Sequence, residues 1–189
     1  MVWPASASMP SPRCWADNVP RYGRSVIRAA RPDDYARLQE IEREAGELFR
    51  EIGMPEIAEH PPGDIHDFAA AEALLVAELD DRIVGYAWIE LVDSATYLEQ
   101  LSVVPAAGRQ GIGTALLDAV ADWARARGDR SVTLTTFRDV PFNGPLYERR
   151  GFVHVPEAEW TDDLHSVIDH QAAMGMDRAN RTVMRRTLG

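Results

Sequence analysis

A glycine-rich turn is the part of the sequence whose residue types and spacing are best suited to bind an anion. It reads Gly108-Arg109-Gln110-Gly111-Ile112-Gly113 and lies between an apolar run, 98–104, and an alanine- and leucine-rich stretch, 114–127. Glycine lets backbone N–H groups approach a ligand closely, and the first turn of a helix offers unpaired N–H donors with a partial positive charge. We therefore predict a strand, a turn and a helix that together bind phosphate or pyrophosphate.

Two common phosphate-binding motifs do not fit this turn. A P-loop requires a lysine directly after its last glycine, where this sequence has Thr114, so nucleotide hydrolysis is not expected. The dinucleotide-binding fingerprint requires a third small residue three positions after the second glycine, where the sequence has Leu116. A third class of turn, which binds the diphosphate of an acyl-CoA, remains as the alternative.

Two motifs occur in order between Tyr97 and Phe152. The glycine turn follows the strand pattern Leu101-Ser102-Val103-Val104-Pro105, and a tyrosine precedes a Gly-Phe pair in Leu146-Tyr147-Glu148-Arg149-Arg150-Gly151-Phe152. This segment resembles the GCN5-related N-acetyltransferase (GNAT) superfamily, whose glycine motif is Q/R-x-x-G-x-G/A. Gly108 stands where the family has Gln or Arg. Because backbone N–H groups hold most of the pyrophosphate, we expect this change to weaken one contact without abolishing the site.

The resemblance implies a fold and a donor substrate. The fold is α/β (α+β): a mixed, largely antiparallel sheet of about six to seven strands, with helices on both faces and a splayed central parallel pair. The donor is acetyl-CoA or another acyl-CoA, whose pantetheine arm lies in the gap of the splayed pair, and no metal is expected. Carried over to this sequence, the residues that bind the donor are Leu101, Ser102, Val103, Gly108, Arg109, Gln110, Gly111, Ile112, Gly113, Thr114, Asn143 and Tyr147.

Asn143 is included because the sequence departs from the family at a second position. An asparagine usually lies seven residues before the tyrosine, and here that residue is Val140. We expect Asn143 to supply the lost contact and Arg138 or Asp139 to face the acceptor. The backbone N–H of Val103 is the candidate for polarising the acyl carbonyl.

Acyl transfer to an amine requires a base, because an alkylammonium ion cannot attack a thioester, and an acid for the departing thiolate. Glu99 resembles the family's acidic general base, although strand alternation could equally point Gln100 inward and leave Glu99 in solvent or paired with an arginine. Tyr147 resembles the family's general acid. The alternative is a packed core tyrosine whose hydroxyl contacts the backbone.

The predicted function is therefore acyl-CoA-dependent N-acyl transfer, most simply from acetyl-CoA to a primary amine of a small molecule, directly in a ternary complex. Acceptors of this kind include aminoglycoside-like compounds and free amino acids, and a protein N-terminus or lysine is a further alternative. Two other functions fit the fold: an aminoacyl-tRNA-dependent transferase, and a non-catalytic acyl-CoA-binding sensor or interaction module.

Composition limits the partners. The net charge of −10 disfavours nucleic acid and anionic membranes. The single cysteine, Cys14, excludes an internal disulfide framework. No apolar run approaches the roughly 18 to 20 residues of a membrane span, and no signal peptide is recognised, so we expect a cytoplasmic protein. A homodimer is compatible with the apolar last strand. The histidines His154, His165 and His170 match no common zinc spacing.

The elements that must position these residues follow from hydrophobic periodicity. We expect a leader without ordered structure at 1–24 and one acyltransferase domain at 25–189. The segment at 53–63 should line the acceptor pocket, and 156–180 should form a lid or pocket wall around a helix at 163–173. The other predicted elements are strands at 25–28, 73–79, 83–91, 97–104, 131–136, 152–155 and 182–188, and helices at about 33–49 and 114–127.

Overall fold

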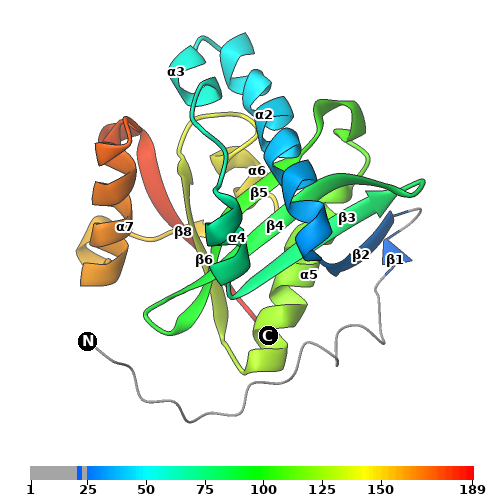
Figure 1. Cartoon of the computed structure of the whole chain (residues 1–189). Coiled ribbons are helices and arrows are strands. Elements are labelled where there is room, and N and C mark those ends of the chain that lie inside the picture. Colours follow the sequence, from blue (N-terminus) through cyan, green and yellow to red (C-terminus); the bar gives the residue numbers. More distant parts are fainter. Residues whose placement is uncertain (1–20, 23–24) are drawn as a thin grey trace.

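The computed structural model, which describes residues 21–22 and 25–189, contains one eight-stranded sheet with helices on both faces (Figure 1). The strand order is β1-β2-β3-β4-β5-β6-β8-β7. The GNAT-like mixed fold expected from the sequence is confirmed. The count reaches eight because β1 (Arg21–Tyr22) and β7 (Val153–His154) are two-residue strands at the sheet edges.

The antiparallel half of the sheet contains two tight hairpins. Its longer strands are β2 (Ser25–Ala29), β3 (Ala73–Leu79), β4 (Arg82–Val92) and β5 (Ala95–Val103). Both turn residues of the β3–β4 hairpin and of the β4–β5 hairpin have positive φ, which matches the twist of two-residue hairpins and which aspartate tolerates better than most residues. These residues are Asp80, Asp81, Asp93 and Ser94.

The parallel pair splays apart, as expected. Strand β6 (Ser131–Phe137) pairs with β5 only through Tyr97 with Thr133 and Leu98 with Leu134. Beyond that point β6 stays paired along its whole length with β8 (Arg181–Thr187), while β5 continues without a neighbour on this side. A gap with unpaired backbone groups therefore opens in the middle of the sheet.

The long helix α5 (Ile112–Arg127) packs its apolar side against the sheet and is bounded by two glycines with left-handed φ. Gly111 is the N-cap with φ 85°, and Gly128 is the C-cap with φ 88°. Both conformations strongly favour glycine. The predicted helix is confirmed, with its start two residues earlier than the sequence pattern indicated.

Helix α2 (Tyr35–Glu51) covers the opposite face of the sheet and follows a short 3-10 turn, η1 (Pro32–Asp34). Its N-terminal half buries Leu38 and Ile41, whereas Ile52, which follows the helix, is 43% exposed. The apolar side of α2 therefore packs on the sheet only over its first half. The second half extends beyond the sheet and is free to border a cavity.

Helix α7 (Asp162–Ala173) stands beside β6 and β8 on its own small core, in which Tyr97 packs with Val155, Ile168 and Val183. The helix expected at 163–173 is confirmed. The remaining short elements are α3 (Pro55–Ala58), α4 (Ile65–Ala70), η2 (Pro105–Ala107), α6 (Gly144–Glu148), η3 (Glu157–Glu159) and η4 (Arg178–Asn180).

The predicted boundary between leader and domain falls inside a hairpin. Arg21 and Tyr22 pair with Val26 and Ser25, so the first strand precedes residue 25. The rest of the predicted leader, 1–20 and 23–24, and Cys14 with it, lies outside the described residues. Across the part of the chain that is described, no helix is long and apolar enough to cross a membrane.

Candidate active site

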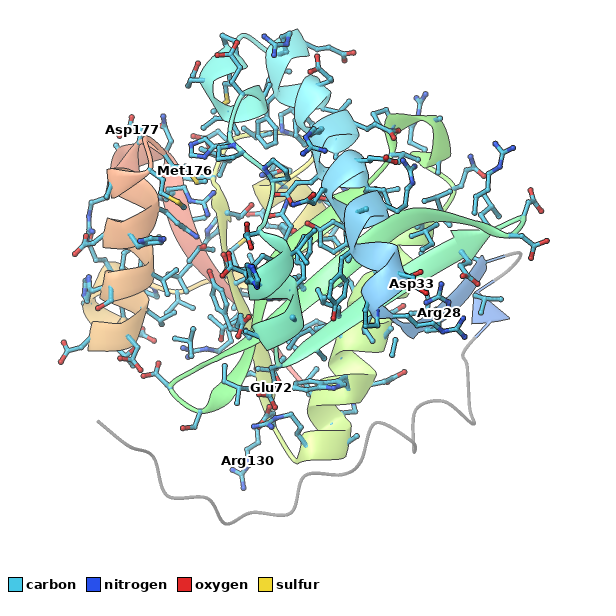
Figure 2. All side chains as sticks on the ribbon, viewed as in Figure 1. Arg28, Asp33, Glu72, Arg130, Met176 and Asp177 are labelled. Atoms are coloured by element: carbon cyan, nitrogen blue, oxygen red, sulfur yellow. The ribbon has the colours of Figure 1, made fainter. Side chains whose placement is uncertain are left out.

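A cavity of about 970 Å³ lies at the splay of β5 and β6. Its walls are the C-terminal half of α2, the glycine turn before α5, helix α6, and the end of α7 with the segment that follows it. Met176 belongs to this wall, and Figure 2 shows it next to Asp177, where the chain leaves α7. Residues from both predicted motifs therefore face one space.

The glycine turn points unpaired N–H groups toward the cavity. The first helical bond runs from the N–H of Ala115 to the carbonyl of Gly111, and no side chain caps the helix. In the turn and the first helical turn, the N–H groups of residues 109–114 have no backbone acceptor outside the helix. The left-handed φ of Arg109 (59°) and Gly111 (85°) shapes the turn. The result is a row of amides suited to a diphosphate.

All but one of the predicted residues of this turn line the cavity. Gly108, Arg109, Gly111 and the three residues that open α5 do so. Gln110 does not: its side-chain amide donates to the carbonyl of Ala106 at 3.3 Å, and it borders a separate surface depression. A donor contact through the Gln110 side chain is therefore not supported by its position.

The unpaired edge of β5 faces the same cavity. The N–H of Val104 donates to the carbonyl of Val84 at 2.9 Å, toward β4. Because N–H groups alternate along a strand, those of Val103 and Leu101 point away from β4 and into the splay. Leu101, Ser102 and Val103 all line the cavity. This edge can pair with an extended chain that carries amide groups.

Three arginines line the cavity. They are Arg109, Arg149 and Arg150, and none of their guanidinium groups has a hydrogen-bond or ion-pair partner among the described residues. Their charge contrasts with the overall net charge of −10. The donor set of free amides, strand edge and guanidinium groups therefore fits the diphosphate, phosphate and pantetheine arm of an acyl-CoA.

A β-bulge in β5 brings both Glu99 and Gln100 to the cavity. Trp88 pairs with Gln100 and Ile89 with Leu98, so Glu99 is the extra residue on β5. Both Glu99 and Gln100 line the cavity, an outcome that regular alternation would not allow. The side chain of Gln100 is held by a hydrogen bond, since its amide donates to the hydroxyl of Ser102 at 2.9 Å.

The carboxylate of Glu99 has no hydrogen-bond or ion-pair partner among residues 21–22 and 25–189. Burial raises its pKa above the usual range for glutamate, and the negative charges of Glu90 and Glu42 raise it further, against the opposing effect of Arg181. A carboxylate that is desolvated and unbonded can accept a proton at neutral pH. Glu99 therefore has the properties of a general base.

Tyr147 reaches the cavity from α6, where its ring packs edge-on against Phe152 at 5.6 Å between centroids. Burial raises the pKa of Tyr147 to about 12, so the phenol stays protonated at neutral pH. Its hydroxyl has no hydrogen-bond partner in the described residues. Since no fully enclosed side-chain oxygen or nitrogen there lacks a partner, this hydroxyl must border open space, and it can donate to a ligand.

The loop before α6 is held by a close backbone contact. A Cβ added at Gly144 would lie 2.2 Å from the carbonyl oxygen of Arg138, so only glycine fits. Asn143 precedes it, lines the cavity, and its carbonyl accepts from the N–H groups of Leu146 and Tyr147 at 2.8 and 3.0 Å. Val140, where the family has asparagine, is buried and outside the cavity lining.

Arg138 and Asp139 do not line the cavity, so the structure does not support their proposed role at the acceptor. The segment 53–63 does contribute, through Ile57, Ala58 and His60. The expected pocket wall after α7 is also present. In the described residues, no group of three or more histidine, cysteine, aspartate or glutamate side chains is placed to hold a metal ion.

Sequence reasoning missed four charged residues that line the cavity: Glu42, Arg149, Arg150 and Arg181. Glu42, on α2, accepts from the hydroxyl of Tyr86 at 2.6 Å and from the N–H of Gly63 at 3.2 Å. Burial raises its pKa despite these bonds. Arg181 is the first residue of β8 and lies two positions before the buried Val183. Because side chains two residues apart on a strand share a face, this spacing was a signal that could have placed Arg181 on the inner face. The periodicity of α2 contained no comparable signal for Glu42.

A model of the acetyltransferase (GNAT) family matches residues 35–152, which is more than half of the sequence. The chain belongs to the GNAT acetyltransferase family. This GNAT domain contains every element that bounds the cavity from α2 to α6.

Individual relatives agree with this assignment. A protein from Xenopus laevis named probable N-acetyltransferase camello is 38% identical over 80 residues, which are 41% of this chain and 36% of that protein. The chain therefore matches about a third of the length of this curated relative.

Two solved structures show the same fold at low identity. The PaiA N-acetyltransferase of Thermoplasma acidophilum, solved with coenzyme A, superposes with a TM-score of 0.63 at 16% identity, over 86% of this chain and 98% of that one. The N-acetylglutamate synthase of Neisseria gonorrhoeae, solved with coenzyme A and N-acetyl-glutamate, gives 0.62 at 22% identity, over 89% of this chain and 36% of that one.

Proposed function

We propose that this GNAT chain transfers an acyl group, most simply acetyl, from acyl-CoA to the primary amine of a small molecule. Direct transfer in a ternary complex needs both substrates in one space with a base and an acid. The observation that carries the proposal is that Glu99 and Tyr147 line the same cavity as Arg109 and residues 111–114, whose amides are free. The proposed donor site and the proposed catalytic pair therefore share one cavity.

The donor supplies the activated acyl group as a thioester, and the chain supplies its alignment. The amides of residues 109–114 bind the diphosphate, and the free edge of β5 pairs with the amides of the pantetheine arm. In this arrangement the N–H of Val103 points into the splay, where it can donate to the acyl carbonyl oxygen. A donor at this position stabilises the charge that develops on that oxygen during attack.

Glu99 accepts a proton from the acceptor ammonium, directly or through a water molecule, and leaves a neutral amine. The amine nitrogen forms a bond to the acyl carbon, the bond between that carbon and sulfur breaks, and the nitrogen loses its second proton to solvent. Tyr147 donates its phenolic proton to the departing thiolate. The amide product and free CoA leave, and the phenolate regains a proton from solvent, with Glu99 releasing the one it took.

The deciding experiment measures the free CoA thiol released from acetyl-CoA with a panel of acceptors: amino acids, amino sugars, diamines, and peptides with a free N-terminus. We expect acceptor-dependent release with at least one small amine, together with acetyl-CoA binding by calorimetry. No release with any acceptor and no binding would overturn the proposal.

The same assay separates the other functions considered for this fold. A sensor would bind acetyl-CoA without acceptor-dependent release, and Glu99→Gln and Tyr147→Phe would leave that binding and any cellular effect unchanged. A tRNA-dependent transferase would bind tRNA with an affinity that falls steeply as salt rises. The cytoplasmic location and the homodimer stay predictions, which cell fractionation and analytical ultracentrifugation would test.

A further inference from the structure

Arg181 is a buried cation with no carboxylate bonded to it. Only 7% of its surface is exposed. Its Nε and Nη2 donate to Oε1 of Gln171 at 3.1 and 2.8 Å, and Nη2 also donates to Oγ1 of Thr135 at 3.0 Å. The guanidinium lies over the ring of Phe137, 4.7 Å from its centroid. Neutral groups therefore orient the charge but do not neutralise it.

The remaining nitrogen of Arg181 faces the cavity. Nη1 has no hydrogen-bond partner in the described part of the chain, where no fully enclosed side-chain nitrogen lacks one. Nη1 must therefore border open space, and Arg181 is one of the residues that line the cavity. Two N–H donors on a charged group are thus available there to a ligand.

The position of the Arg181 guanidinium determines which group of a ligand it can bind. Arg181 donates to Thr135, which directly follows the last residue of β6 that pairs with β5, just as Glu99 directly follows Leu98 on β5. Arg181 and Glu99 therefore both lie where the splay opens, at the proposed reacting end of the cavity. The amides that fit the diphosphate lie at the glycine turn, on another wall. The anion that Arg181 faces is therefore part of the acceptor and not a phosphate of the donor.

A buried guanidinium without a bonded carboxylate destabilises a fold, because neutral partners replace its lost hydration only in part. Burial accordingly lowers the pKa of Arg181, yet arginine stays protonated in proteins. A ligand carboxylate would supply the missing charge in the bidentate geometry that guanidinium favours.

We propose that Arg181 binds the carboxylate of the acceptor while Glu99 faces its ammonium group, so that the acceptor is an amino acid. This inference rests on the proposed transferase function and narrows its acceptor class. Two opposite charges in one small cavity match a zwitterion. A polycationic acceptor such as an aminoglycoside has no group for Arg181, and a protein lysine has no carboxylate beside its amine.

The test compares amino acids with their carboxamides, which keep the amine and side chain but lose the negative charge. We expect the wild type to favour the acid in kcat/KM by about 10- to 100-fold, the size of a charge-assisted hydrogen-bonded contact. Arg181→Gln should bring this ratio close to one, mainly by raising KM for the acid. Arg181→Lys should recover part of the preference.

Arg185→Gln is the matched control, since Arg185 lies on the same strand and outside the cavity lining. It should keep the wild-type ratio. A wild-type enzyme that acetylates acids and carboxamides equally well would overturn the proposal, as would an Arg181→Gln protein that is folded and retains the preference.

A binding experiment keeps the test informative if no acceptor is turned over or if Arg181→Gln does not fold. N-acetyl amino acids carry the carboxylate without the amine, and their carboxamides are the neutral counterparts. With CoA present, calorimetry on the wild type should detect the acids and find the carboxamides at least about tenfold weaker, a difference of 1.4 kcal/mol. Equal or absent binding of both would overturn the carboxylate site, whereas failure of turnover alone would overturn the transferase function.

Discussion

At the scale of single residues, the least conventional feature is a half-buried glutamate whose carboxylate has no partner. The carboxylate of Glu99 has neither a hydrogen bond nor an ion pair among the described residues, and its pKa is raised. A bulge in β5 places it there in addition to Gln100. Such groups reduce stability and persist where they have a chemical role.

Glu99→Gln should lower kcat by about 10²- to 10⁴-fold, the usual contribution of a general base. In the wild type, kcat/KM should rise with pH through a limb that lies above the ordinary glutamate pKa of about 4.3. The variant should lack this limb when both proteins are assayed with one acceptor. A wild-type and a variant profile of the same shape would contradict the assignment.

The same variant should be more stable than the wild type at neutral pH. Because the native pKa of Glu99 is raised, the native state binds more protons than the unfolded state between the two pKa values, and stability falls as pH rises through that window. Glutamine removes this loss. Thermal unfolding should show the gain above the window and none below about pH 4, where the carboxyl is protonated in both states.

Tyr147→Phe tests whether Tyr147 is the general acid that protonates the departing thiolate. The free hydroxyl and the pKa of about 12 make the phenol a donor at neutral pH. We expect kcat to fall by about 10²-fold, while KM for acetyl-CoA stays within about twofold, since little of the binding surface changes. Tyr35→Phe, remote from the cavity lining, is the control and should leave both constants unchanged. A Tyr147→Phe enzyme with wild-type kcat would exclude this residue as the acid.

At the scale of elements, substitutions at the two ends of α5 allow effects on ligand binding to be distinguished from effects on stability. A Cβ added at Gly113 would lie 3.9 Å from Cγ2 of Val103, an ordinary contact, and Gly113 lines the cavity. Gly128 ends the same helix with φ 88°. We therefore expect Gly113 to matter for ligand binding and Gly128 for the backbone.

Gly113→Ala should therefore fold at least as well as the wild type, with up to about 1 kcal/mol gained from helix propensity. Its methyl group should obstruct the diphosphate and raise KM for acetyl-CoA by about tenfold or more, equivalent to 1.4 kcal/mol. Gly128→Ala should lose about 1 kcal/mol of stability and keep the wild-type KM. Denaturant titration and steady-state kinetics measure the two effects, and the reverse pattern would refute the amide site.

At the scale of the whole molecule, the splay that forms the cavity leaves backbone groups of the sheet unpaired. Strand β5 pairs with β6 through only two residue pairs before the gap opens. The amides left free there and at the glycine turn need water or a ligand. The donor should therefore contribute to the stability of the whole domain.

Saturating acetyl-CoA should raise the free energy of unfolding by about 2.7 kcal/mol at a hundred times its Kd. Thermal unfolding of the full chain over a series of acetyl-CoA concentrations measures this. ATP has phosphates but no arm to pair with the edge of β5, and it should give a much smaller shift at the same concentration. No shift with acetyl-CoA, or an equal shift with ATP, would contradict pairing along the splay.

The sequence by itself determined the features that depend on neighbouring residues. The glycine turn, the helix after it and the hairpins were all predictable, because φ preferences, capping and periodicity act within a few residues. The order of these elements, together with the two family motifs, was enough to predict the mixed sheet with its splay.

Only the tertiary structure decided how side chains far apart in sequence meet. The bulge that turns Glu99 inward depends on the register between β4 and β5, and the outward position of Gln110 depends on the packing around η2. Arg181 reaches the cavity because β8 inserts between β6 and β7. Strand register and burial are set by long-range packing, which no local pattern of residues encodes.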